Sequence, residues 1–216
     1  MLKSLNRPVD LTEGTPWKGI IKFTLPMLVG NIAQQLYSTV DSIVVGKYIG
    51  DNALAAVGSA LPIVNLLLVL FIGISAGASI MVAQYVGAKN RENLSYTIGN
   101  SITATAIACV ALIAAILPFL DEIIPLLNTP ESLETDCYNY LAISLIGIAG
   151  MAYYNILSGL LRGLGDSFSA LVYLLVATVV NVFLDIYFVA SWGLNMGVAG
   201  VAWATIIAQV VSSVFL

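Results

Sequence analysis

Six long apolar runs, separated by short polar segments, make up most of the sequence. They lie near residues 17–46, 53–85, 94–120, 134–161, 168–190 and 197–216. A helix needs about 20 apolar residues to cross a bilayer, and these runs are long enough. They lack the strict alternation of membrane β-barrel strands, as LPIVNLLLVLFIGI at 61–74 illustrates. The sequence therefore predicts an all-α integral membrane protein, a six-transmembrane-helix bundle over 17–216 that follows a polar segment at 1–16.

Charged residues are scarce, and this excludes several other classes of protein. Hydrophobic residues make up 59% of the chain and charged residues 9%, where soluble domains have about 25% charged residues. The net charge of −4 argues against a nucleic-acid binder, which needs a basic surface. The absence of His, with only Cys109 and Cys137 as thiols, excludes His-based catalysis and most zinc sites. We expect no cofactor.

The positions of Lys and Arg predict the orientation in the membrane, because cytoplasmic loops carry an excess of both. With the N-terminus inside, only Lys47 falls outside. We therefore expect a multi-pass protein of the cell inner (cytoplasmic) membrane with a cytoplasmic N-terminus. The last run ends without a basic anchor, from which we expect a sequence cut short. The basic residues on the inner side are Lys3, Arg7, Lys18, Lys22, Lys89, Arg91 and Arg162.

Two acidic residues fall well inside apolar runs, away from the ends of the runs: Asp41 in the first and Asp185 in the fifth. An ionised Asp at the bilayer centre costs about 2.5–3.5 kcal/mol on insertion scales, so it usually faces a bundle interior or a watery cavity. Each Asp precedes a glycine at the outer end of its run by a little over two helical turns, roughly 10 Å or more. This matched depth predicts that the two carboxylates share one chamber.

Polar side chains recur at steps of three and four residues in several runs, which places them on one face of each helix. A polar stripe in a bilayer has to turn inwards, so we expect the stripes to enclose a polar chamber. The predicted lining residues are Gln34, Gln35, Ser38, Met151, Tyr154, Thr178, Thr205 and Gln209.

Such a chamber suits a coupling proton, or Na⁺ held by Asp41, Asn181 and Asp185. Two simpler interpretations stay open. Asp41 could be a helix-end residue paired with Lys47, and Asn181 could only link two helices, which is a common role for membrane amides.

Pro26 interrupts the first run and removes a backbone hydrogen bond, which kinks a helix. A moving bend there would shift the stripe from Gln34 to Asp41 against the rest of the bundle. We therefore expect Pro26 to be a hinge, with a static kink as the alternative.

Several segments resemble the multidrug and toxic compound extrusion (MATE) family, and most closely its prokaryotic DinF-like branch. FTLPMLVGNIAQQLYSTVDSIVVGKYIG, followed by ALAAVG, resembles the family's first helix and the segment after it. GLLRGLGDS and NVFLDIYF are similar to its fourth and fifth helices. The resemblance runs from about Thr15 to Leu216.

The resemblance implies multidrug efflux, an antiport of cationic or amphipathic compounds against H⁺ or Na⁺. It implies twelve helices in two lobes, with this chain as the amino-terminal lobe, so a second six-helix lobe would be needed in cis or in trans. It also implies a first-helix proline that bends, and a cation site to which the matching residues are Asp41, Asn181 and Asp185, with Asn155 and Ser158 on the fourth helix.

Two other functions are compatible with parts of this pattern. A lipid-linked saccharide flippase of the same superfamily needs a basic cavity, and with Arg162 in an inner loop no Lys or Arg falls mid-membrane, which argues against this function. Gly163-Leu164-Gly165-Asp166 fits the GxGD pattern of intramembrane aspartyl proteases. Asp166 is predicted on the inner side, however, across a core of ~30 Å from the other two acids. We therefore expect a transporter rather than an enzyme, with drugs and the bilayer as partners and no nucleic acid.

Overall fold

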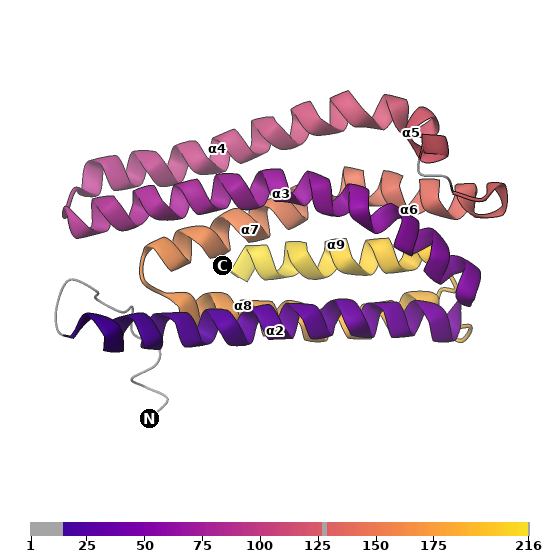
Figure 1. Ribbon diagram of the computed structural model, residues 1–216, viewed down its shortest axis with the longest axis horizontal. Coiled ribbons are helices and arrows are strands. Elements are labelled where there is room, and N and C mark those ends of the chain that lie inside the picture. The colour runs from indigo at the N-terminus through magenta and orange to yellow at the C-terminus, as the bar shows by residue number, and fades with distance from the viewer. Residues whose placement is uncertain (1–14, 127–128, 216) are drawn as a thin grey trace.

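The protein is a bundle of long helices that lie roughly along one axis, in a computed structural model that describes residues 15–126 and 129–215 (Figure 1). The described residues contain no strand, and the predicted all-α membrane fold is confirmed. Most of the predicted segment 1–16, with Lys3 and Arg7, lies outside the described residues. The helices are α2 (Pro16–Tyr48), α3 (Asp51–Gly87), α4 (Arg91–Ile116), η1 (Leu117–Phe119), α5 (Leu120–Leu126), η2 (Glu131–Leu133), α6 (Glu134–Ile146), α7 (Ile148–Gly163), α8 (Ser167–Val189) and α9 (Val198–Phe215).

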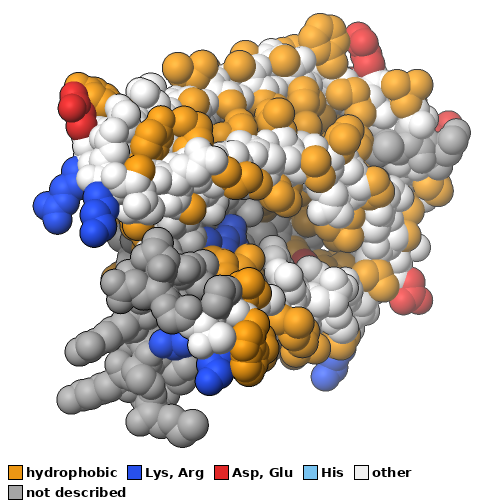
Figure 2. All heavy atoms as spheres, turned by 60° about the vertical axis from the view of Figure 1, so that its left-hand side comes forward, with side chains coloured by type: hydrophobic (Ala, Val, Ile, Leu, Met, Phe, Trp, Pro, Cys, Tyr) orange, Lys and Arg blue, Asp and Glu red, His pale blue; other side chains and the backbone are white. Residues whose placement is uncertain are grey.

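Four helical segments of the described chain are long and apolar enough to cross a membrane: Asp51–Gly87, Arg91–Leu126, Ser167–Val189 and Val198–Phe215. Glu131–Ile146 and Ile148–Gly163 make a fifth if this bent pair is one span. The amides and hydroxyls of α2 lower its hydropathy, so its crossing of a membrane stays a prediction. Large apolar side chains cover much of the outer surface, as expected of a surface in contact with lipid (Figure 2).

The predicted helix 134–161 is bent by 48° at Gly147, between α6 and α7. The cause is close packing against α9. A Cβ on Gly147 would overlap Ile206, and one on Gly150 would lie 2.7 Å from Cγ2 of Val210. The two glycines thus allow α9 to pack closely against the bend between α6 and α7.

Small residues hold α7 directly against α3. A Cβ on Gly163 would lie 2.6 Å from the backbone oxygen of Ser79, and one on Gly159 would overlap Ser75. The Ser75 hydroxyl donates a 2.6 Å hydrogen bond to the backbone oxygen of Asn155. This is the small-xxx-small packing of membrane helices. It fixes the rotation of α7 and turns its polar residues towards α2 and α8.

The N-terminal end of α8 is tied to the neighbouring helix α2. Asp166 caps α8 by accepting a 2.9 Å hydrogen bond from the backbone N–H of Ser169. The Ser167 hydroxyl donates a 2.9 Å hydrogen bond to the backbone oxygen of Phe23 in α2. From this point α2 and α8 run side by side towards their C-terminal ends (Figure 1). Their contact positions the candidate site.

Candidate functional site

The two intramembrane aspartates meet between α2 and α8. Asp41 lies on α2, and Asp185 lies on α8 one turn after Asn181. Asn181 and Asp185 are fully buried, and the carboxyl groups of Asp41 and Asp185 lie close to each other. The sequence predicted from their matched depth that these two carboxylates lie in one chamber, and in the structure they lie next to each other.

The oxygens of this acidic pair lack partners. Oδ1 of Asp41, Oδ1 of Asn181 and both carboxyl oxygens of Asp185 are buried without a hydrogen-bond partner among the described residues. Lys47, the candidate partner of Asp41, is exposed, with its Nζ 5.8 Å from the centre of the Tyr48 ring. Adjacent carboxyls buried away from water require a shared proton or a cation. The set of oxygens fits either one.

A hydroxyl on α9 connects the two helices of the pair. Thr205 Oγ1 accepts hydrogen bonds from the Tyr37 hydroxyl at 3.1 Å and from Nδ2 of Asn181 at 3.4 Å. Tyr140 of α6 is also buried beside the carboxyl pair. The site therefore draws on four helices, and its hydroxyl groups can orient the oxygens around a bound cation or proton.

Sequence reasoning missed both tyrosines. Tyr37 lies one helical turn before Asp41, on the same stripe, and this spacing was a usable signal. Tyr140 offered no signal, because the rotation of its helix relative to the others is set by tertiary packing.

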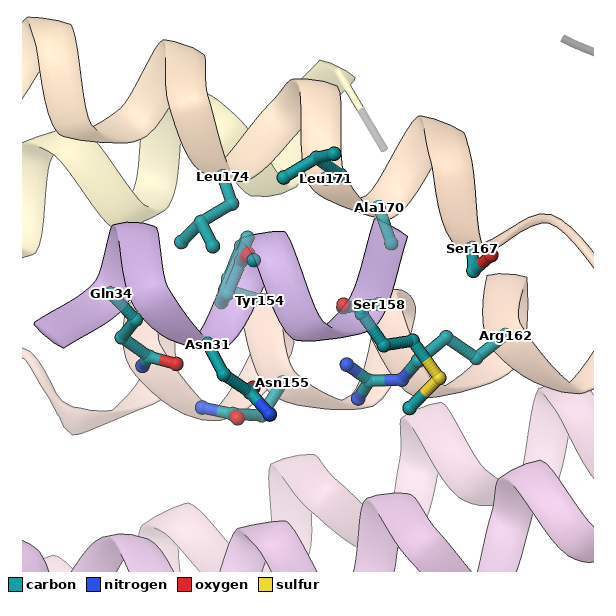
Figure 3. A pocket seen from close by; sticks show the side chains of 12 residues that line it. Asn31, Gln34, Tyr154, Asn155, Ser158, Arg162, Ser167, Ala170, Leu171 and Leu174 are labelled. Carbon is teal, nitrogen blue, oxygen red and sulfur yellow. The ribbon is translucent and has the colours of Figure 1, made fainter. Parts of the chain in front are cut away.

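A second polar cavity of about 50 Å³ lies further inward between α2, α7 and α8 (Figure 3). From Gln34 on its wall to Asp41 is about two helical turns, or roughly 10 Å. Asn155 and Ser158 line this cavity, and Nδ2 of Asn155 donates a 2.8 Å hydrogen bond to the backbone oxygen of Met151. The structure thus divides the five predicted cation-site residues between the carboxyl pair and this cavity.

The other predicted lining residues have varied environments. Gln34 and Tyr154 line the inner cavity, whereas Gln35 and Ser38 are exposed on α2. Thr178 donates its hydroxyl to the backbone oxygen of Leu174 in its own helix. Met151 is buried, and Oε1 of Gln209 is buried without a partner among the described residues. Pro26 is buried within a continuous α2.

The sequence predicted that Arg162 lies in a loop, and this prediction is wrong. Arg162 belongs to the last turn of α7 and lines the inner cavity, because α7 continues to Gly163. The argument against a basic cavity is weaker for this reason. The protease interpretation gains nothing, since Asp166 caps α8 and lies nineteen residues, ~28 Å, before Asp185 along that helix.

A helical membrane lobe with buried acids and polar cavities has the architecture of a transporter lobe. The family model MatE matches residues 26–188, and the chain belongs to this family. The expected MATE resemblance is thereby confirmed. The family consists of transporters and not enzymes, which agrees with the expectation from sequence.

Curated relatives and solved structures match nearly all of the chain. It is 33% identical over 202 residues to the Bacillus subtilis protein named "Probable multidrug resistance protein YoeA", covering 93% of this chain and 44% of the relative. A MOP superfamily transporter from Pyrococcus furiosus superposes with a TM-score of 0.90 at 30% identity, over 97% of this chain and 46% of that one. A MATE in the bent conformation gives a TM-score of 0.86 at 30% identity, over 94% and 44%. The chain spans less than half the length of these proteins.

Proposed function

We propose that this chain is the amino-terminal, cation-binding lobe of a multidrug exporter that exchanges cationic or amphipathic compounds for H⁺ or Na⁺. The observation that carries the proposal is the buried pair Asp41 and Asp185, in which three of the four carboxyl oxygens have no hydrogen-bond partner among the described residues. The names of the curated relatives support the substrate class. The exporter would lie in the cytoplasmic membrane with its N-terminus inside, and a second six-helix lobe would complete the central cleft.

The coupling follows from the charge of the pair. A proton or Na⁺ between the two carboxyls holds α2 against α8, and loss of that cation leaves two like charges that repel each other. For Na⁺, the oxygens of Asp41, Asn181, Asp185 and Thr205 would be the ligands. Asn155 and Ser158 lie in the inner cavity, away from this set of ligands.

A change in the contact between α2 and α8 needs a point at which α2 can bend. Pro26 lacks the backbone N–H of an ordinary helical residue, so bending there breaks no hydrogen bond of its own. The existence of a similar MATE in a bent conformation supports this role. We propose that Pro26 is the hinge at which α2 bends when a cation binds to or leaves the carboxyl pair. This bending would move the face of α2 that lines the chamber.

The test separates cation binding from export. Purified chain is titrated with Na⁺ at several pH values by calorimetry, which requires no second lobe. We expect the chain to bind Na⁺, or to take up or release protons. This signal should be lost in Asp41→Asn and in Asp185→Asn. Asp121→Asn, which alters an exposed acid on the outer side, is the matched control and should behave as wild type.

Export is then measured in vesicles that contain the chain together with a carboxy-terminal lobe. Cation-driven efflux of a cationic dye should require both aspartates. Efflux that persists in both Asn variants would contradict the proposed coupling site. Cation binding without any efflux would support the proposed cation site but contradict the proposed export function.

A further inference from the structure

We infer that the inner cavity is an oxyanion-binding site centred on Arg162, which takes the phosphate or carboxylate group of an amphiphile. The cavity lies between α2, α7 and α8, separate from the acidic pair. Its wall combines one cation with neutral hydrogen-bonding groups and an apolar side. This assignment is independent of the proposed antiport.

Arg162 carries the only charge on the wall of this cavity as formed by the described residues. Its guanidinium runs towards Asn31 and Asn155 (Figure 3). No carboxylate oxygen of the described Asp and Glu residues lies within 4.0 Å of its guanidinium nitrogens. Asp166, the nearest acid in sequence, uses both of its carboxyl oxygens to accept hydrogen bonds from Ser169.

An Arg at the inner end of a membrane helix normally extends into water. Arg91 does so at the start of α4, where its side chain is exposed. Arg162 instead is half-buried, because Gly159 and Gly163 hold the adjacent face of α7 against α3. A guanidinium partly withdrawn from water without a counter-charge loses some of its solvation, and an anion in the cavity offsets this cost.

The neighbouring groups suit an oxyanion. A guanidinium presents a planar fork of N–H donors that fits a carboxylate or phosphate at two points. Asn31 and Gln34 supply amide donors from α2, and the Ser158 hydroxyl lies on the same wall. A cavity of about 50 Å³ has room for roughly three waters, or for one small oxyanion group in their place.

The other side of the cavity indicates what the oxyanion is attached to. Met27, Leu171 and Leu174 form an apolar wall beside the polar one. A ligand that satisfies both walls has an anionic head and an apolar body. Lipids of the inner leaflet have this chemistry, and so do soluble amphiphilic anions. The acidic pair further out would repel such a group, which restricts it to the inner cavity.

The test measures binding of an anionic lipid to the purified full chain by native mass spectrometry. Short-chain phosphatidylglycerol is the probe, and phosphatidylcholine of the same length is the neutral reference. We expect one phosphatidylglycerol to bind preferentially. Arg162→Gln should weaken this binding about tenfold or more, and Arg162→Lys less, because the ammonium keeps the charge but not the fork.

Arg91→Gln is the matched control, because it removes the same charge from an exposed inner position, and its affinity should stay within about twofold of wild type. Asn31→Leu provides a second variant that keeps Arg162, with an expected loss of about threefold to tenfold for one hydrogen bond. Equal losses in Arg91→Gln and Arg162→Gln, or no loss in Arg162→Gln that elutes as a monodisperse protein, would overturn the assignment.

Competition by excess inorganic phosphate then distinguishes the source of the anion. Displacement of the lipid by phosphate would support a site open to soluble oxyanions. Binding of lipid that depends on Arg162 but resists phosphate would support a lipid headgroup site.

Discussion

Thr205 is the residue on which the hydrogen bonds of the buried site converge. Its Oγ1 accepts from Tyr37 on α2 and from Asn181 on α8. Thr205→Val keeps the shape of the side chain but removes this acceptor, so two donors lose their partner. We expect the lobe to lose about 1–3 kcal/mol of stability, measured by thermal unfolding in detergent.

Thr178→Val is the control for this substitution. Its hydroxyl donates only to the backbone of its own helix, so its loss leaves no donor without a partner. We expect a change within about 0.5 kcal/mol. Equal destabilisation by the two variants would mean that Thr205 does not connect the helices.

The repulsion within the acidic pair gives a second prediction at this scale. Asp185→Asn removes one of two buried carboxyls without changing the shape of the side chain. At neutral pH and without Na⁺, we expect the variant to be more stable than wild type by about 1 kcal/mol or more. Asp41→Asn should act in the same direction.

The alternative interpretation of Asp41 predicts the opposite sign. If Asp41 were held by Lys47, Asp41→Asn and Lys47→Gln would each lower the melting temperature. Melting curves of the purified variants show whether the melting temperature rises or falls, with Asp121→Asn as a neutral reference.

The sequence was informative about residues whose burial is costly. Asp41 and Asp185 could be paired from their depth alone, because depth follows from counting helical residues. Tyr140 and Arg162 could not be placed in this way. The rotation of α6 decides which helix Tyr140 faces. Arg162 lies on a cavity wall rather than in a loop because α7 continues to Gly163, two residues past the predicted end of the helix.

At the scale of elements, the contact between α3 and α7 rests on glycine. Gly163→Ala adds a Cβ that would lie 2.6 Å from the backbone oxygen of Ser79, which cannot move without shifting α3. We expect a loss of about 1–3 kcal/mol from overpacking. Thermal unfolding of the purified variant in detergent measures it.

Gly77→Ala is the matched control on α3. A Cβ there meets nothing within 4 Å, so Ala should keep or raise stability by up to about 1 kcal/mol through helix propensity. Loss of stability in both variants would show that the contact is not specific to Gly163.

The positions of the helices follow from their apolar runs, but their bends do not. Hydropathy predicted one helix over 134–161, and the structure has a 48° angle at Gly147. Gly147 and Gly150 were visible as a pair of small residues. Their effect depends on Ile206 and Val210 of α9, residues distant in the sequence that fill the angle.

At the scale of the whole molecule, charge is distributed unequally between the ends of the bundle. Lys and Arg gather at the end that carries the turn between α3 and α4 (Figure 2). Acidic side chains are prominent at the far end, where α5 and α6 contribute Asp121, Glu122, Glu134 and Asp136. By the positive-inside rule, we predict that the basic end faces the cytoplasm.

Single cysteines test this orientation in intact cells. The native Cys109 and Cys137 are buried, so background labelling of the wild-type chain by a membrane-impermeant maleimide should be low. Ser191→Cys, at the exposed turn between α8 and α9, should be labelled from outside. Glu92→Cys, exposed in the first turn of α4, should be labelled only after the cells are permeabilised, because it lies at the basic end. Labelling of Glu92→Cys but not Ser191→Cys in intact cells would invert the topology. The acidic pair, which lies nearer the outer end of α2 in the predicted orientation, would then open towards the cytoplasm, and the direction of the proposed exchange would have to be reversed.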